Sequence, residues 1–242
     1  MASIQAINAQ PRFPGSISGN LKTVRARIVK AAQNSGRDPD GITLLAASKS
    51  WSAEYLAEAT RAGQKSFGEN YVGEGVSKIA ELAAYGLEWH FIGPLQGNKT
   101  RPVAENFTWV HSIDRLRIAE RLSEQRPEYL APLQVCLQVN TSGEATKSGV
   151  SPQEASALAH RIATLPRLVL RGLMAIPEPE DDFSRQRAAF CRLRKLASVL
   201  KKEGLDLDTL SMGMSHDLEA AIAEGSTLVR IGTAIFGERG KK

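Results

Sequence analysis

The chain has few cysteines and no long apolar segment. These two features argue against a disulfide-rich or metal-binding protein and against a membrane protein. Only two cysteines, Cys136 and Cys191, occur in 242 residues, far apart and outside any metal-type spacing. Reduced thiols and a cytoplasmic location are the default expectation. No stretch approaches the roughly 20 apolar residues that span a bilayer. The amino terminus also lacks the basic start and continuous apolar segment of a secretion signal. We therefore expect no membrane association.

The positive charge is modest and scattered. The formal net charge is +5, and the hydrophobic and charged contents of 42% and 24% are ordinary for a globular protein. A solvated helix face explains the densest basic group better than a nucleic-acid site does, because no aromatic side chains are interleaved with it. That group is Arg192, Arg194, Lys195, Lys201 and Lys202. The charge can still attract an anionic small molecule.

Strand and helix patterns alternate along the chain. Eight strands are predicted, at 42–50, 66–69, 89–93, 109–113, 134–140, 170–176, 209–214 and 228–231. Helices are predicted at 17–33, 52–62, 71–84, 96–105, 115–124, 152–164, 184–203 and 217–223. Alternating strands and helices indicate a parallel sheet with right-handed connections.

The absence of glycine in the first strand-to-helix turn, SKSWSAE, argues against an open dinucleotide-binding sheet. Eight units in about 240 residues favour an α/β fold that is a single (β/α)₈ TIM-type barrel with an extra N-terminal helix. We expect residues 1–15 to be a flexible lead-in and residues 16–242 to form the single barrel domain.

Lys49 is the first candidate for chemistry. It ends the apolar run ITLLAASKS, which has the pattern of a strand buried on both faces. Loss of hydration there would favour the free amine, which is a nucleophile for carbonyls and a candidate for a Schiff base. The alternative is that Lys49 is simply the first solvated residue after the strand.

The loops after the last two strands offer a phosphate site. Barrels of this kind often bind phosphate there, with backbone N–H groups and a helix amino terminus. Ser215 would lie at the start of the seventh barrel helix, Gly232 lets the backbone approach an anion, and Thr233 adds a hydroxyl and an N–H. Alternatively, Ser215 is an ordinary helix cap and Gly232 a turn glycine.

Arg230 interrupts an apolar strand and needs a partner inside the barrel. A heterocyclic nitrogen or a carboxylate would serve, and a pyridine nitrogen facing it would stay unprotonated. The alternative is an ion pair with Glu219 or Asp217 at the strand mouth.

Four sequence blocks together carry a family resemblance. They are FGENYVGEG at 67–75, WHFIGPLQGNK at 89–99, RGLMAIP at 171–177 and LSMGMSHDLEAAIAEGSTLVRIGTAIFG at 210–237. With these blocks in order, the chain resembles the pyridoxal phosphate homeostasis proteins, single-barrel relatives of the alanine racemase amino-terminal domain. The resemblance runs from about Leu44 to Gly237.

The resemblance implies a pyridoxal 5'-phosphate (PLP) site and a role for each residue in it. Lys49 would carry the cofactor as an aldimine, while Ser215, Gly232 and Thr233 would hold its phosphate. Arg230 would lie at the pyridine nitrogen, with Asn70, Met174 and, more weakly, Ser211 lining the ring pocket. The family is thought to buffer PLP or deliver it to apo-enzymes in vitamin B6 homeostasis, without established catalytic turnover.

Three functions compete for this site. The first is a PLP carrier without catalytic residues, and the second is an amino acid racemase. In a related racemase, a second, β-rich domain and the dimer partner supply a tyrosine acid/base opposite the lysine. We expect this chain to have no room for that domain, so that one of the two bases is missing. The third, a nucleic-acid or adaptor protein, rests on the charge alone. We expect a monomer whose partners are PLP and, in delivery, apo PLP enzymes.

Other residue groups do not make a site by their spacing. Ser215, His216 and Asp217 are neighbours whose side chains diverge, so they cannot relay a proton as a hydrolase triad does. The histidines at 90, 111, 160 and 216 show no metal-ligand spacing, and His90 is either a pocket residue or a packed strand residue. Lys147 could accept the aldehyde in transit, or it could be a solvated loop residue.

Overall fold

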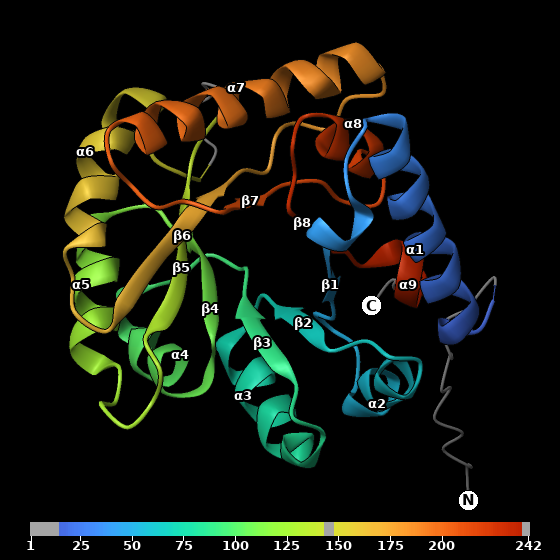
Figure 1. The fold of residues 1–242 in the computed structure, drawn as a ribbon. Coiled ribbons are helices and arrows are strands. Elements are labelled where there is room, and N and C mark those ends of the chain that lie inside the picture. Colours follow the sequence, from blue (N-terminus) through green and yellow to red (C-terminus); the bar gives the residue numbers. More distant parts are fainter. Residues whose placement is uncertain (1–14, 143–147, 239–242) are drawn as a thin grey trace, which may run out of the picture.

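The barrel is closed by eight parallel strands in sequence order. The computed structural model describes residues 15–142 and 148–238. Each strand pairs with the next, and β1 pairs with β8 in parallel, Leu45 opposite Arg230 (Figure 1). The strands are β1 (Thr43–Ala47), β2 (Ser66–Glu69), β3 (Glu88–Phe91), β4 (Trp109–Ile113), β5 (Leu133–Gln138), β6 (Leu168–Met174), β7 (Thr209–Ser211) and β8 (Leu228–Ile231). The predicted fold class is confirmed.

Helices surround the barrel, and one precedes it. They are α1 (Ile17–Asn34), α2 (Ala53–Arg61), α3 (Val72–Glu81), α4 (Thr100–Asn106), α5 (Leu116–Gln125), α6 (Pro152–Ala163), α7 (Phe183–Lys202), α8 (Leu218–Ala223) and α9 (Thr233–Phe236). Short 3₁₀ turns lie at Pro39–Gly41 (η1), Ala83–Tyr85 (η2) and Gly97–Lys99 (η3). In the described part of the chain, no helix is long and apolar enough to cross a membrane.

The extra helix α1 begins where the sequence provides a cap. The Ser16 hydroxyl accepts a hydrogen bond from the Gly19 N–H at 3.1 Å. Leu21, Val24 and Ile28 recur at helical spacing and are buried. That face packs against α8 and α9, so α1 lies outside the junction where β8 meets β1 (Figure 1). The predicted lead-in lies almost entirely outside the described residues.

Several strands are shorter than predicted at their carboxyl ends. The predicted strand 209–214 stops at Ser211, and 134–140 stops at Gln138. Past Ser211 the chain turns at Gly213, whose φ of +97° is in the left-handed region that favours glycine. A Cβ there would also lie 2.6 Å from the Ala221 Cβ. Met214, which follows this turn, lines the cavity described next.

Candidate cofactor site

The loops at the carboxyl ends of the strands enclose a cavity of about 230 Å³. Most of the predicted site residues line it, namely Lys49, Asn70, Ser215, Arg230, Gly232 and Thr233. Ala47, Trp51, Ile92, Ile176, Met214, His216 and Gly237 complete the lining. Met174 and Ser211 do not line it; both are fully buried at paired positions of β6 and β7. Their expected place in the ring pocket stays a prediction.

Lys49 lies two residues past the end of β1, in a turn with an unusual backbone. The next residue, Ser50, has a φ of +68°, which non-glycine residues rarely adopt. The Ser50 N–H donates to Glu74 Oε1 at 2.6 Å. Lys49 itself is half-buried and lines the cavity. A left-handed residue persists only where its surroundings hold it, so the groups around Ser50 fix the position of Lys49.

A buried ion network supplies that support. Lys78 on α3 donates to Glu69 Oε1 at 2.8 Å, to Glu74 Oε1 at 2.6 Å and to the Ser48 carbonyl at 2.9 Å. The Ser48 hydroxyl donates to the same Glu69 oxygen at 2.5 Å. Glu69 is fully buried, and burial raises the pKa of its carboxyl while Lys78 opposes the rise. The network therefore holds both residues that flank Lys49 along the chain.

The phosphate end brings Ser215 and α9 together. The Ala234 N–H points at the Ser215 hydroxyl at 3.4 Å, and Thr233 begins α9 directly after Gly232. A Cβ on Gly232 would lie 3.1 Å from the Ala47 carbonyl oxygen, so glycine allows the close approach of β8 to β1. Helix α8 begins at Leu218 with Asp217 as its N-cap. The expectation that Ser215 starts this helix is therefore wrong, because a turn intervenes.

Arg230 lies at the bottom of the cavity, almost fully buried. Its Nη1 donates to Ser211 Oγ at 2.7 Å, and its Nη2 donates to the Ala175 carbonyl at 3.0 Å. Burial lowers the pKa of Arg230 to about 10, so the guanidinium stays charged at neutral pH. Of the two carboxylates considered from the sequence, Glu219 pairs with Arg27, whereas Asp217 acts on the Arg230 pKa only through space.

Asn70 brings an unsatisfied polar atom to this site. Its Oδ1 is buried and has no hydrogen-bond partner among the described residues. A buried acceptor without a partner is costly in a folded protein. Asn70 also lines the cavity, so this unpaired amide group lies next to the space a ligand would fill.

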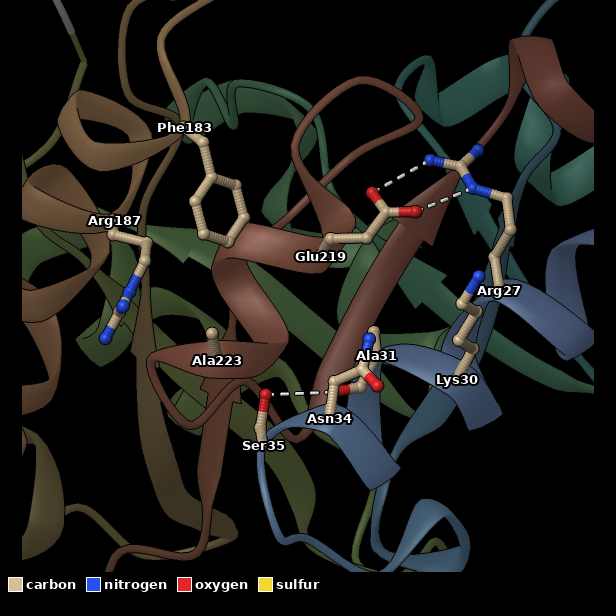
Figure 2. Close-up of a pocket in the computed structure, with 9 residues that line it drawn as sticks. All are labelled: Arg27, Lys30, Ala31, Asn34, Ser35, Phe183, Arg187, Glu219 and Ala223. Carbon is tan, nitrogen blue, oxygen red and sulfur yellow. Dashed lines mark hydrogen bonds and ion pairs between the residues drawn. The ribbon is translucent and has the colours of Figure 1, made fainter.

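A larger cavity of about 680 Å³ lies outside the barrel, between α1, the start of α7, and α8 (Figure 2). None of the predicted site residues lines it. Arg27 donates to both Glu219 oxygens, at 2.8 and 3.0 Å, and to the Ser215 carbonyl at 3.0 Å. This cavity therefore borders the Ser215 turn from the outside, and Arg27 fastens that turn to α1.

Two histidines inside the barrel lie directly beneath the site. His90 Nδ1 and His111 Nε2 are 2.9 Å apart, and both side chains are buried. Burial lowers the pKa of each ring, that of His111 well below its usual value because His90 and Arg230 add to the effect. His90 is thus a packed strand residue. No pattern in the sequence indicates that His111 lies beside it, or that Lys78 lies beneath the Lys49 turn.

These buried histidines should make folding stability sensitive to acid. Their folded pKa values are depressed, so the unfolded chain binds more protons below about pH 6.5. Stability is therefore greatest above that pH and falls on acidification by about 1.4 kcal/mol per histidine for each pH unit, down to the folded pKa. Urea denaturation at several pH values should show a reduced slope in His111→Gln. His160→Gln, on the exposed face of α6, should keep the wild-type slope.

Known proteins resemble this chain over almost its whole length. The alanine racemase N-terminal domain family matches residues 20–240. The pyridoxal phosphate homeostasis proteins of Pseudomonas aeruginosa and Escherichia coli K12 are 61% and 57% identical to the chain. These matches span 93% and 92% of this chain and 96% and 97% of the relatives. The chain belongs to the pyridoxal phosphate homeostasis protein family. The resemblance inferred from the four sequence blocks is confirmed.

Solved structures extend the comparison. PipY of Synechococcus elongatus PCC7942, in a structure with PLP bound, is 36% identical, with a TM-score of 0.82. The match covers 92% of this chain and all of PipY. Alanine racemase from Corynebacterium glutamicum is 18% identical with a TM-score of 0.64, and the match covers 89% of this chain but 60% of that enzyme. The racemase shares the barrel fold.

Proposed function

We propose that the chain binds PLP in the 230 Å³ cavity, carries it through a Schiff base to Lys49, and buffers or delivers it in vitamin B6 homeostasis. One observation carries the proposal: a single cavity holds an amine, a buried guanidinium and the Ser215–Gly232 region. These are the groups that an aldehyde, a pyridine nitrogen and a phosphate require. Family membership and the structure of PipY with PLP bound support it.

Each residue has a defined task in this proposal. Lys49 would supply the amine that condenses with the aldehyde and releases water, a covalent and reversible attachment. Ser215 would offer a hydroxyl, and Gly232 and Thr233 backbone N–H groups, to the phosphate. Arg230 would donate to the ring nitrogen, and Asn70 would lie beside the ring. When bound, the cofactor supplies the aldehyde that this amine holds and can give up.

The charge of Arg230 favours a carrier over an enzyme. Most PLP chemistry uses a protonated pyridine nitrogen to draw electrons from the substrate. A guanidinium that stays charged and can only donate keeps that nitrogen unprotonated.

The lining of the cavity bears on the racemase alternative directly. Two-base racemisation needs a second acid/base opposite the lysine, and a tyrosine serves in related enzymes. All four tyrosines of this chain are described, and none lines the cavity. We therefore propose a monomeric cytoplasmic carrier whose partners, besides PLP, are apo PLP enzymes.

The proposed binding site is tested by trapping bound PLP on the protein with borohydride. Purified protein titrated with PLP should bind one equivalent and gain visible absorption, and borohydride should fix the label on the peptide that contains Lys49. Pyridoxal, which lacks the phosphate, should bind much more weakly, and pyridoxine 5'-phosphate, which lacks the aldehyde, should bind without colour. A label elsewhere, or equal binding of pyridoxal, would contradict the assignment. Racemisation of alanine by the loaded protein would favour the enzyme instead.

A further inference from the structure

A row of hydrogen-bonded side chains crosses the barrel interior beneath the cavity. Glu88 Oε2 lies 3.0 Å from His90 Nε2, and His90 Nδ1 lies 2.9 Å from His111 Nε2. His111 Nδ1 lies 2.7 Å from Ser211 Oγ, which accepts from Arg230 at 2.7 Å. Glu88 begins β3 at the amino-terminal mouth, whereas Arg230 lines the cavity at the other end. The row therefore joins the two ends of the barrel.

The chemistry of its ends fixes the direction of every bond. The ionised Glu88 carboxylate can only accept, so His90 donates to it from Nε2. Because burial keeps the His90 ring neutral, its Nδ1 accepts from His111 Nε2, and His111 Nδ1 is then an acceptor. Ser211 accepts from Arg230, which can only donate, and gives its own hydrogen to His111 Nδ1. The pKa of Glu88, lowered to about 2 by its hydrogen bonds, keeps it ionised.

Burial leaves the inner members no alternative partners in water. His90, His111 and Ser211 are exposed by 1%, 0% and 0%, and Arg230 by 4%. An unmade hydrogen bond among them would leave a buried polar group unsatisfied, which is expensive. Glu88 is further held by hydrogen bonds from Ser66 and Trp109 at 3.0 and 3.2 Å. These bonds hold Glu88 in place, and through it the orientation of every side chain in the row.

We propose that this row holds the Arg230 guanidinium oriented toward the cofactor cavity. Its other members, Ser211, His111, His90 and Glu88, are then positioning residues. This inference rests on the proposed function. With Nη1 directed to Ser211 and Nη2 to the Ala175 carbonyl, the remaining N–H groups are those available to a ligand. The row is not a proton path into the cavity, because reversing it would require the arginine to give up a proton.

The first test of the row needs no cofactor. Nitrogen chemical shifts of the histidine rings should show His90 and His111 both neutral, with the hydrogen on Nε2, at neutral pH. A Nδ1–H tautomer or a charged ring at either position would overturn the row itself. This measurement stands whether or not PLP binds.

The second test is the dissociation constant for PLP, together with the visible band of the bound protein. Ser211→Ala should weaken binding about tenfold and shift the band, because the freed guanidinium must be ordered on binding. Ser123→Ala is a matched control, since it also removes a buried hydroxyl, one that donates to the Pro166 carbonyl on the outside of the barrel. It should bind PLP like the wild type.

A second pair of variants tests the row independently if Ser211→Ala does not fold. His111→Gln can still accept from Ser211 through its amide oxygen and donate to His90 through its nitrogen, whereas His111→Leu can do neither. We expect the glutamine variant to retain affinity and band position and the leucine variant to lose both. Wild-type affinity in Ser211→Ala or His111→Leu would overturn the positioning role. Failure of the wild type to bind PLP would instead contradict the proposed function.

Discussion

Lys49→Ala should abolish the covalent attachment of PLP. The variant lacks the amine that we assign to the Schiff base, so borohydride should fix no label and the visible band of the bound protein should be absent. Noncovalent binding should persist more weakly, because Arg230 and the Ser215–Gly232 region are untouched. Absorption spectra before and after borohydride, combined with peptide mass analysis, measure both effects.

Lys99→Ala provides the matched control. Lys99 ends the 3₁₀ turn η3 on the same carboxyl-end face of the barrel, but it is exposed and does not line the cavity. Its removal should leave colour and labelling unchanged. If Lys49→Ala remains yellow and is still labelled, Lys49 loses its assigned role and Lys99 or Lys147 becomes the candidate. Lys147 lies outside the described residues, so its position supports neither reading.

The sequence predicted the strand order and most of the cavity because both depend on local signals. Strand cores are apolar runs, and the carboxyl ends of parallel strands meet at one mouth, so residues after each strand converge whatever the details of packing. Lys49 and Gly232 follow β1 and β8, neighbours that pair directly, and both line the cavity. Their proximity needed only the barrel topology.

The sequence could not tell which way side chains point within the strands. A strand buried on both faces shows no alternation, so its inner and outer residues look alike. For this reason nothing in the pattern indicates that His111 meets Ser211, which lies 100 residues away in the chain. The resemblance implies that Met174 and Ser211 line the ring pocket, and in the structure neither lines the cavity.

The sequence pattern does not indicate the Lys78 network either, but for a different reason. Glu74 and Lys78 are spaced i,i+4 on a helix, a pattern that usually marks a solvated ion pair. Here the Lys78 side chain is only 5% exposed, because α3 turns it toward the end of β2 and the Lys49 turn. Spacing along one helix cannot reveal a second carboxylate, Glu69, contributed by a strand. Tertiary packing alone makes this pair part of the site.

Lys78→Met should destabilise the protein strongly and disturb the Lys49 turn. The substitution leaves Glu69 fully buried without its cation, and breaking a buried ion pair in this way costs about 3 to 5 kcal/mol. Urea denaturation measures the loss in the free energy of unfolding. Arg101→Met, which removes an exposed i,i+4 pair with Glu105 on α4, should cost less than about 1 kcal/mol.

The double variant Lys78→Met/Glu69→Gln separates buried charge from lost packing. Removing the carboxylate removes the uncompensated charge, so the double variant should recover part of the stability lost in Lys78→Met. Without Lys78, the pKa of the Glu69 carboxyl should rise further, since burial already raises it and its cation is gone. A raised folded pKa gives stability that is present in acid and is lost as pH rises through that pKa. Lys78→Met should therefore approach the wild type on acidification, whereas a deficit that stayed constant with pH would show that packing, and not the Glu69 charge, accounts for the loss.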